Sequence, residues 1–190
     1  MNVLVNIPNL LTLIRICLVP VMVAVSSQGH ANLFLGILIF AFFTDALDGF
    51  IARTFGLQTK FGARLDSLAD FAVYISIPIC AWLLWPDVIR KEMIYVLAVV
   101  ASIVMPVGIG ILKFGSYTSY HTWLTKLAAA SMAIASILLF VGGPVWLFRS
   151  AAMLCVLAAL EEILITLILK EPKSNVRSLW TVLRNHRKHA

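Results

Sequence analysis

The stretch "DALDGFIARTFGLQTKFGARLDSLAD", residues 45–70, contains four of the nine acidic residues of the chain. Asp45 and Asp48 are three residues apart, and Asp66 and Asp70 are four apart, so each pair lies on one face of a helix. The segment 54–62 between the pairs is short, which predicts that the two helices are antiparallel neighbours. The two carboxylate pairs are therefore expected to converge.

The sequence around this stretch is typical of membrane helices. The 190-residue chain is 61% hydrophobic and 13% charged, whereas a soluble domain carries about 25% charged residues. Apolar runs near the ~20 residues needed to cross a bilayer predict an all-α polytopic membrane protein, a single domain over 1–190, with six transmembrane helices at about 9–27, 32–52, 65–85, 92–112, 123–141 and 145–169. Segments 26–32, 85–92 and 142–144 are expected to be outer turns, and 54–62 and 113–121 inner loops.

The distribution of basic residues predicts the orientation. If the termini are cytoplasmic, the opposite side holds only Arg90, Lys91 and Arg149, and Arg15 lies within the first span. This arrangement satisfies the positive-inside rule and predicts a multi-pass protein of the cell inner membrane, with a cytoplasm-facing site. Anionic lipid accounts for the net charge of +6 without a nucleic-acid partner. The expected cytoplasmic side holds eleven basic residues: Arg53, Lys60, Arg64, Lys113, Lys126, Lys170, Lys173, Arg177, Arg184, Arg187 and Lys188.

The segment 170–190 is a basic tail of different character. Apolar residues recur in it at helical spacing, which predicts a short amphipathic helix in the membrane surface, capped by Ser174 or Asn175. A disordered basic tail is the alternative. The apolar positions are Val176, Leu179, Trp180 and Leu183.

Four carboxylates at a membrane face need a compensating cation. One charged side chain inside a membrane costs roughly 2.5–3.5 kcal/mol, so four unpaired ones would cost on the order of 10 kcal/mol. Arg53 and Arg64 are candidate partners, but they leave two acids uncompensated. A divalent metal such as Mg²⁺ is the stronger interpretation, because hard cations prefer oxygen ligands. The absence of nearby His or Cys argues against zinc.

The residues between the acids suit a phosphate ligand. Gly49, Ala52 and Gly62 leave gaps in the side-chain wall beside the carboxylates, and helical Gly costs up to ~1 kcal/mol relative to Ala. Arg53 and Thr59 supply a cation and a hydroxyl for phosphate oxygens. The sequence therefore predicts a site for a metal-bound diphosphate.

The motif resembles that of the CDP-alcohol phosphotransferase (CDP-alcohol phosphatidyltransferase) family. In these enzymes an alcohol hydroxyl attacks the β-phosphorus of a CDP-linked lipid or alcohol, and CMP departs. The matching residues are Asp45-x-x-Asp48-Gly49-x-x-Ala52-Arg53, eight residues, then Gly62-x-x-x-Asp66-x-x-x-Asp70.

The resemblance implies roles for these residues. Asp45, Asp48, Asp66 and Asp70 would bind two metal ions, Mg²⁺ or Mn²⁺, and Asp70 would also accept the hydroxyl proton. The opening "IPNLLTLIRICLVP" matches a family pattern through Pro8, Asn9, Thr12 and Arg15, although an N-cap and a snorkelling Arg at a helix start would look the same. The CDP-lipid contacts would be Asn9, Thr12, Gly49, Ala52, Arg53, Thr59 and Gly62.

The resemblance also implies CDP-diacylglycerol as the phosphatidyl donor and a homodimeric assembly. The opening segment favours glycerol 3-phosphate as the acceptor, but the Pro and Lys usual around the last two acids of such enzymes are missing. The segment 58–67 is instead similar to phosphatidylinositol-phosphate synthases, so inositol phosphate or another polar alcohol is the alternative. Lys113, Lys126 and Glu161 are candidate acceptor ligands; lysines snorkelling to headgroups, and Glu161 or Glu162 paired with Lys126 or Arg15, are the structural alternatives.

Two other classes of protein are compatible with an acidic cluster in a membrane. A transporter or channel predicts acids at the midplane and broken helices, whereas these acids lie at one membrane face beside glycines. A non-catalytic scaffold has no need for all four. An enzyme is the favoured interpretation.

Overall fold

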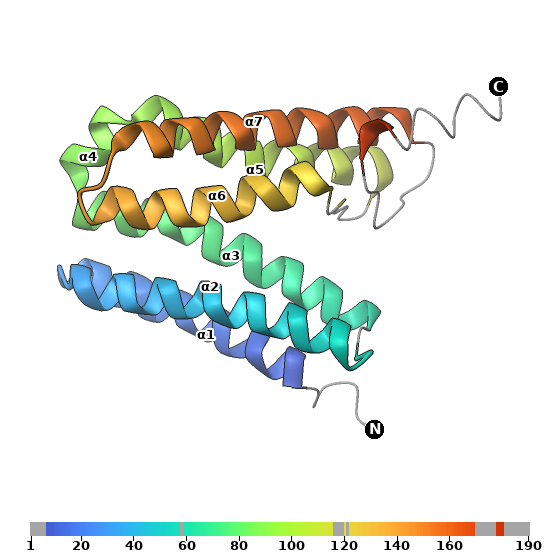
Figure 1. The fold of residues 1–190 in the computed structure, drawn as a ribbon, viewed down its shortest axis with the longest axis horizontal. Coiled ribbons are helices and arrows are strands. Elements are labelled where there is room, and N and C mark those ends of the chain that lie inside the picture. Colours follow the sequence, from blue (N-terminus) through green and yellow to red (C-terminus); the bar gives the residue numbers. More distant parts are fainter. Residues whose placement is uncertain (1–6, 58, 116–119, 121, 170–177, 181–190) are drawn as a thin grey trace. The chain divides into compact units, whose positions relative to one another are not determined.

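The computed structural model describes residues 7–57, 59–115, 120, 122–169 and 178–180. Over these residues the chain forms seven helices and no strand (Figure 1). All of these helices except α4 are long and apolar enough to cross a membrane, which confirms the predicted all-α polytopic fold with six spans. The helices are α1 (Ile7–Ser27), α2 (Ala31–Thr54), α3 (Lys60–Leu84), α4 (Pro86–Lys91), α5 (Met93–Phe114), α6 (Trp123–Phe140) and α7 (Val145–Ile168).

The helix ends agree with the predicted spans to within a few residues, with two exceptions. Helix α3 begins at Lys60, five residues before the predicted span, so Gly62 lies in its first turn. The prediction of a turn at 85–92 was wrong, because α4 occupies most of that segment. Pro86 at its first position, with Asp87 in the first turn and basic residues in the last, favours this short helix.

The predicted surface helix of the tail lies almost wholly outside the described residues. Ser174 and Asn175 are not among them, and of its apolar positions only Leu179 and Trp180 are described, both of them helical.

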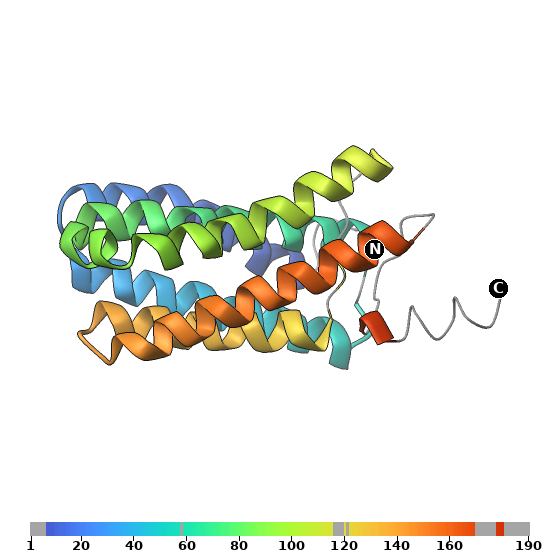
Figure 2. The same ribbon diagram turned by 90° about the horizontal axis from the view of Figure 1, so that it is seen from above.

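Residues 1–91 form one compact unit. Within it, α1 packs along both α2 and α3, while direct contact between α2 and α3 is slight (Figures 1 and 2). Phe34 and Leu38 from α2 and Val73 from α3 are buried in the unit. Helix α1 is thus the central helix, and polar side chains on its buried face can contact both neighbours.

Residues 92–190 form a second compact unit, in which α7 packs against both α5 and α6. At one end of α7, Tyr120, Ile165 and Leu169 form a buried cluster, and Leu179 from the tail packs against it. The tail therefore returns to the end of this unit at Leu179.

An ion pair joins the N-cap residue of α5 to the N-terminal part of α7. The guanidinium of Arg149 donates to both carboxylate oxygens of Glu92, with Nε–Oε2 at 2.9 Å and Nη2–Oε1 at 2.8 Å. The Glu92 side chain is only 5% exposed, so it depends on this partner. Hydrogen bonding to Arg149 lowers the pKa of Glu92 below its ordinary value.

This pair predicts a pH-dependent contribution to stability. Because the pKa of Glu92 is lower in the folded protein, the pair stabilises fully above the ordinary glutamate pKa and is lost as the pH falls through the folded value. At pH 7, Glu92→Gln is expected to lower the melting temperature by a few degrees. As the pH is lowered from 7 through the folded pKa, the wild type and the variant should converge. An equal difference across this range, measured by tryptophan fluorescence in detergent, would contradict the assignment.

Candidate active site

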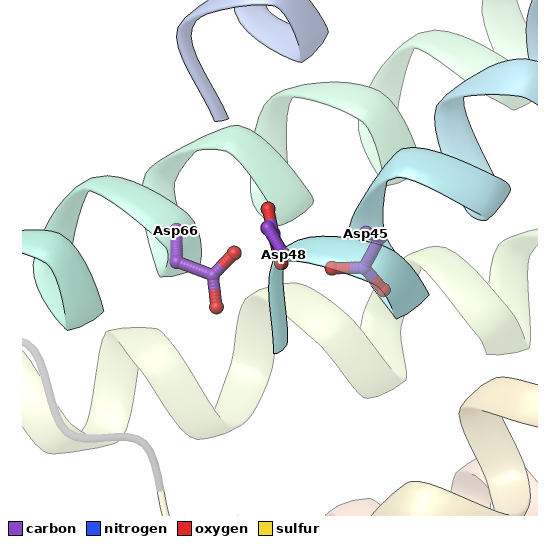
Figure 3. A group of neighbouring side chains, drawn as sticks. All are labelled: Asp45, Asp48 and Asp66. Carbon is purple, nitrogen blue, oxygen red and sulfur yellow. The ribbon is translucent and has the colours of Figure 1, made fainter. Parts of the chain in front are cut away.

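The four aspartates of the motif converge, as the sequence predicted. Carboxylate oxygens of Asp45 and Asp48 from α2 and of Asp66 from α3 all lie within 4.8 Å of one another (Figure 3). The Asp70 side chain lies one helical turn beyond Asp66 and reaches the same guanidinium as the other three. Asp45, Asp66 and Asp70 are 37%, 35% and 27% exposed, so a solute can reach the cluster within this unit.

The side chain among the carboxylates is Arg15 of α1. Its Nη1 lies 2.8 Å from Asp45 Oδ1, 3.2 Å from Asp66 Oδ1 and 2.7 Å from Asp70 Oδ1. Its Nη2 contacts Asp48 Oδ2. The Arg15 side chain is 1% exposed, so it is a buried counter-ion and not a side chain that snorkels to the headgroups.

This geometry corrects the expected choice of counter-ion. The sequence offered Arg53 and Arg64 as candidate partners for two of the aspartates, but both are exposed. The ion pairs of the aspartates recorded over the described residues are with Arg15. The signal that was missed is the spacing of Asn9, Thr12 and Arg15. Residues three apart share one helix face, and a polar face on an apolar helix points inward.

The same face of α1 provides a second donor. Thr12 Oγ1 contacts Asp48 Oδ2 at 3.2 Å and the Pro8 carbonyl oxygen at 3.0 Å. Asp48 is 5% exposed, and a buried carboxylate needs such partners. Helix α1 therefore fixes the most deeply buried aspartate through two of its side chains.

Three of the predicted CDP-lipid contacts meet where α3 begins. Thr59 caps the helix, its hydroxyl accepting from the Gly62 N–H at 2.9 Å. A Cβ at Gly62 would lie 2.6 Å from Asn9 Oδ1 and 3.0 Å from Thr59 Oγ1. Asn9 is buried, so the glycine allows α1 and α3 to approach closely.

The predicted contacts on α2 are more open. A Cβ at Gly49 would lie 3.6 Å from both terminal nitrogens of Arg53, which is ordinary van der Waals distance. Ala52 is half-buried and Arg53 exposed. Along the last two turns of α2, the chain therefore presents a small surface with a cation beside it.

The candidate acceptor ligands belong to the second unit, where each has a local contact. Lys113 Nζ donates to the carbonyl oxygens of Thr166 and Leu167 at 3.0 and 2.8 Å, and Lys126 lies over the Trp123 ring at 5.3 Å. Among the described residues of this unit, no ion pair of either glutamate with Lys126 is recorded, contrary to one suggested pairing.

The two glutamates of α7 instead accept hydrogen bonds. Glu161 accepts from the Thr122 hydroxyl at 2.8 Å and from the Leu179 N–H at 2.9 Å. Glu162 accepts from the Thr125 hydroxyl at 2.9 Å. Glu161 thereby ties the tail to the first turn of α6, a contact that residue spacing alone does not reveal.

The fold and the site define the class of protein, and comparison with known proteins identifies its family. The fold and the four carboxylates define a polytopic membrane protein with an acidic, oxygen-only site. A family model described as CDP-alcohol phosphatidyltransferase matches residues 5–168, and the chain belongs to this family.

Curated relatives match shorter segments. The chain is 39% identical over 93 residues to "Cardiolipin synthase (CMP-forming)" of Homo sapiens, covering 48% of this chain and 30% of that protein. It is 47% identical over 68 residues to "CDP-diacylglycerol--glycerol-3-phosphate 3-phosphatidyltransferase" of Salmonella choleraesuis, covering 34% and 37%. A "Putative cardiolipin synthase" of Mycobacterium tuberculosis is 37% identical over 79 residues, covering 41% and 38%. The chain thus spans less than half the length of each of these relatives, and no solved structure matches it.

Alanine substitutions at the two motif glycines are expected to change the melting temperature differently. Gly62→Ala is expected to lower the melting temperature, because its methyl group would displace the buried Asn9 amide and the Thr59 cap. Gly49→Ala meets only ordinary contacts, and alanine is the better helix former by up to ~1 kcal/mol, so its melting temperature should stay the same or rise. Thermal unfolding of both variants without substrate makes the comparison. Equal destabilisation would show that the close approach of α1 and α3 is not what requires Gly62.

Proposed function

We propose that this protein transfers a phosphatidyl group from CDP-diacylglycerol to a small alcohol and releases CMP. The observation that carries this proposal is the convergence of the four motif aspartates from α2 and α3 in a member of the CDP-alcohol phosphatidyltransferase family. The relatives' names, which include CMP-forming synthases and a phosphatidyltransferase, support the same reaction.

The residues fit divalent metal. All donors in the cluster are carboxylate oxygens, which Mg²⁺ and Mn²⁺ prefer, and three carboxylates lie close enough to share an ion. Four ionised carboxylates and one guanidinium leave a formal charge of −3, so Arg15 alone does not neutralise the site. Two divalent ions, held by Asp45, Asp48, Asp66 and Asp70, would stabilise the charge of the attacking and leaving oxygens.

The chemistry assigned to the protein is a displacement at phosphorus. The acceptor oxygen forms a bond to the β-phosphorus, the bond from that phosphorus to the bridging oxygen breaks, and CMP leaves with that oxygen. Asp70 accepts the proton of the acceptor hydroxyl. A positioned general base of this kind contributes about 10²–10⁴ in rate.

The CDP part is assigned to the small and polar residues around the cluster. Arg53 and Thr59 contact phosphate oxygens, and Gly49 and Ala52 allow the nucleotide to approach the backbone of α2. Asn9, Thr12 and Gly62 are assigned to the nucleotide contacts where α1 meets α3. The meeting of Asn9, Thr59 and Gly62, and the contact of Thr12 with Asp48, bring these residues together along α1, beside the aspartates.

Glycerol 3-phosphate is the acceptor we assign. The opening segment resembles enzymes that use it, and a relative's name contains it. The names of the cardiolipin synthases make a phospholipid alcohol such as phosphatidylglycerol the second candidate, and inositol phosphate is the third.

From the distribution of basic residues we infer that the termini and the site face the cytoplasm at the cell inner membrane, where charged substrates are available. By family resemblance the working protein is a homodimer, with the chain acting as one catalytic domain. A tag at either terminus that is labelled only in opened vesicles, and not in intact cells, would support this orientation.

The reaction is tested with purified protein, CDP-diacylglycerol and Mg²⁺. CMP release is expected with glycerol 3-phosphate and to be abolished by EDTA, because the diphosphate and the carboxylates repel each other without metal. Asp70→Asn is expected to lower the rate at least about 100-fold. Ser67→Ala, a neighbouring change outside the cluster, is the matched control.

Each acceptor outcome has a distinct meaning. Release with phosphatidylglycerol or inositol 1-phosphate in place of glycerol 3-phosphate would reassign the acceptor and keep the reaction. Folded protein that releases no CMP with any of these acceptors would contradict the proposed activity, and metal uptake into vesicles by such protein would instead favour the transporter class.

Lys113, Lys126 and Glu161 are tested as acceptor ligands by the ratio of two KM values. If Glu161 contacts the acceptor, Glu161→Gln raises the KM for the acceptor and leaves that for CDP-diacylglycerol unchanged. Lys113→Met and Lys126→Met should act likewise if they bind the acceptor phosphate. A lower melting temperature with unchanged KM values would restrict these residues to the contacts that they make within the second unit.

A further inference from the structure

Arg15 occupies the space between the carboxylates that are expected to bind metal. Its Nη1 is 2.7–3.2 Å from oxygens of three aspartates, and its Nη2 contacts the fourth. Carboxylate oxygens ligate Mg²⁺ at about 2.0–2.1 Å. Arg15 holds one oxygen of each carboxylate. An ion that binds these same oxygens needs the space that the guanidinium fills, so at these atoms the two cations exclude each other.

The hydrogen bonding of Arg15 is incomplete in this position. Its Nε is buried and has no hydrogen-bond partner among the described residues. A buried donor without a partner carries a desolvation cost. The four carboxylates hold the terminal nitrogens, but the surroundings do not satisfy the rest of the group, which lowers the cost of moving it.

We propose that Arg15 is the counter-ion of the four aspartates in the metal-free protein, where it holds them together, and that metal binding displaces its guanidinium from them. The proposal rests on the metal dependence of the proposed function. A guanidinium keeps its charge at every physiological pH, so the exchange is governed by metal concentration. Arg15 is a positioning residue in this scheme: it maintains the ligand set and, by competing, weakens the affinity for metal.

The direction in which metal affinity changes when Arg15 is removed separates this role from a merely structural one. If Arg15 only supports the fold, removing it displaces the carboxylates and weakens metal binding. If it competes with metal, removing it tightens metal binding, although the metal-free protein becomes less stable because four uncompensated charges remain.

The experiment measures Mn²⁺ binding by electron paramagnetic resonance, and thermal unfolding in EDTA, with the full chain in detergent micelles and no substrate. Arg15→Gln is expected to bind Mn²⁺ at least about tenfold more tightly than the wild type, because a neighbouring like charge is removed. In EDTA its melting temperature should be lower, and saturating Mn²⁺ should remove most of that difference.

Arg64→Gln is the matched control. It removes one positive charge from the first turns of α3 at an exposed position, so it reports the effect of net charge alone and should change Mn²⁺ affinity less than twofold. Arg15→Lys keeps the charge but loses the fork that reaches four carboxylates. If Arg15→Gln does not fold, Arg15→Lys decides the question, with tighter Mn²⁺ binding than the wild type expected.

The outcomes separate this inference from the proposed function. Mn²⁺ binding that is unchanged or weaker in the Arg15 variants, with the wild type binding Mn²⁺, would overturn the exchange and leave the metal-dependent enzyme intact. Absence of Mn²⁺ binding in every protein would contradict the metal centre itself, and the exchange with it.

Discussion

The contact of one buried guanidinium with four carboxylates is the interaction on which the candidate site depends. Helices α2 and α3 each contribute two aspartates, but they contact each other little, and α1 packs between them. Like charges on two helices repel, and in a membrane the repulsion is screened poorly. Arg15 therefore provides both the charge that lets the aspartates converge and a physical link among the three helices.

The rest of the first unit follows from this constraint. For Arg15 to reach the carboxylates, α1 must approach α3 closely, and the absence of a side chain at Gly62 permits this approach beside Asn9. The Thr59 cap starts α3 early enough to place Gly62 in its first turn. The second unit has its own polar contacts, in which Glu161, Glu162 and Lys113 connect the ends of its helices and the tail.

Much of this arrangement could be predicted from the sequence, for reasons that are local. Apolar runs define the six spans because a bilayer requires a minimum length, and the spacing of Asp45, Asp48, Asp66 and Asp70 brings them to two helix faces. The spacing of Asn9, Thr12 and Arg15 could have indicated an inward polar face of α1, but the partners of Arg15 could not be predicted, because they depend on how α1 is rotated against two other helices. The same holds for Glu161, whose partners come from α6 and from the tail, far away in sequence.

The central claim is that the aspartate cluster is a metal-dependent centre for phosphatidyl transfer, and product stoichiometry tests it most directly. Protein freed of metal by EDTA is given CDP-diacylglycerol and glycerol 3-phosphate, and Mg²⁺ is then added while CMP and the new phospholipid are quantified together. Equal amounts of the two products, appearing only after Mg²⁺, are the predicted result. CMP without a new phospholipid, or product formation that does not depend on metal, would contradict the account.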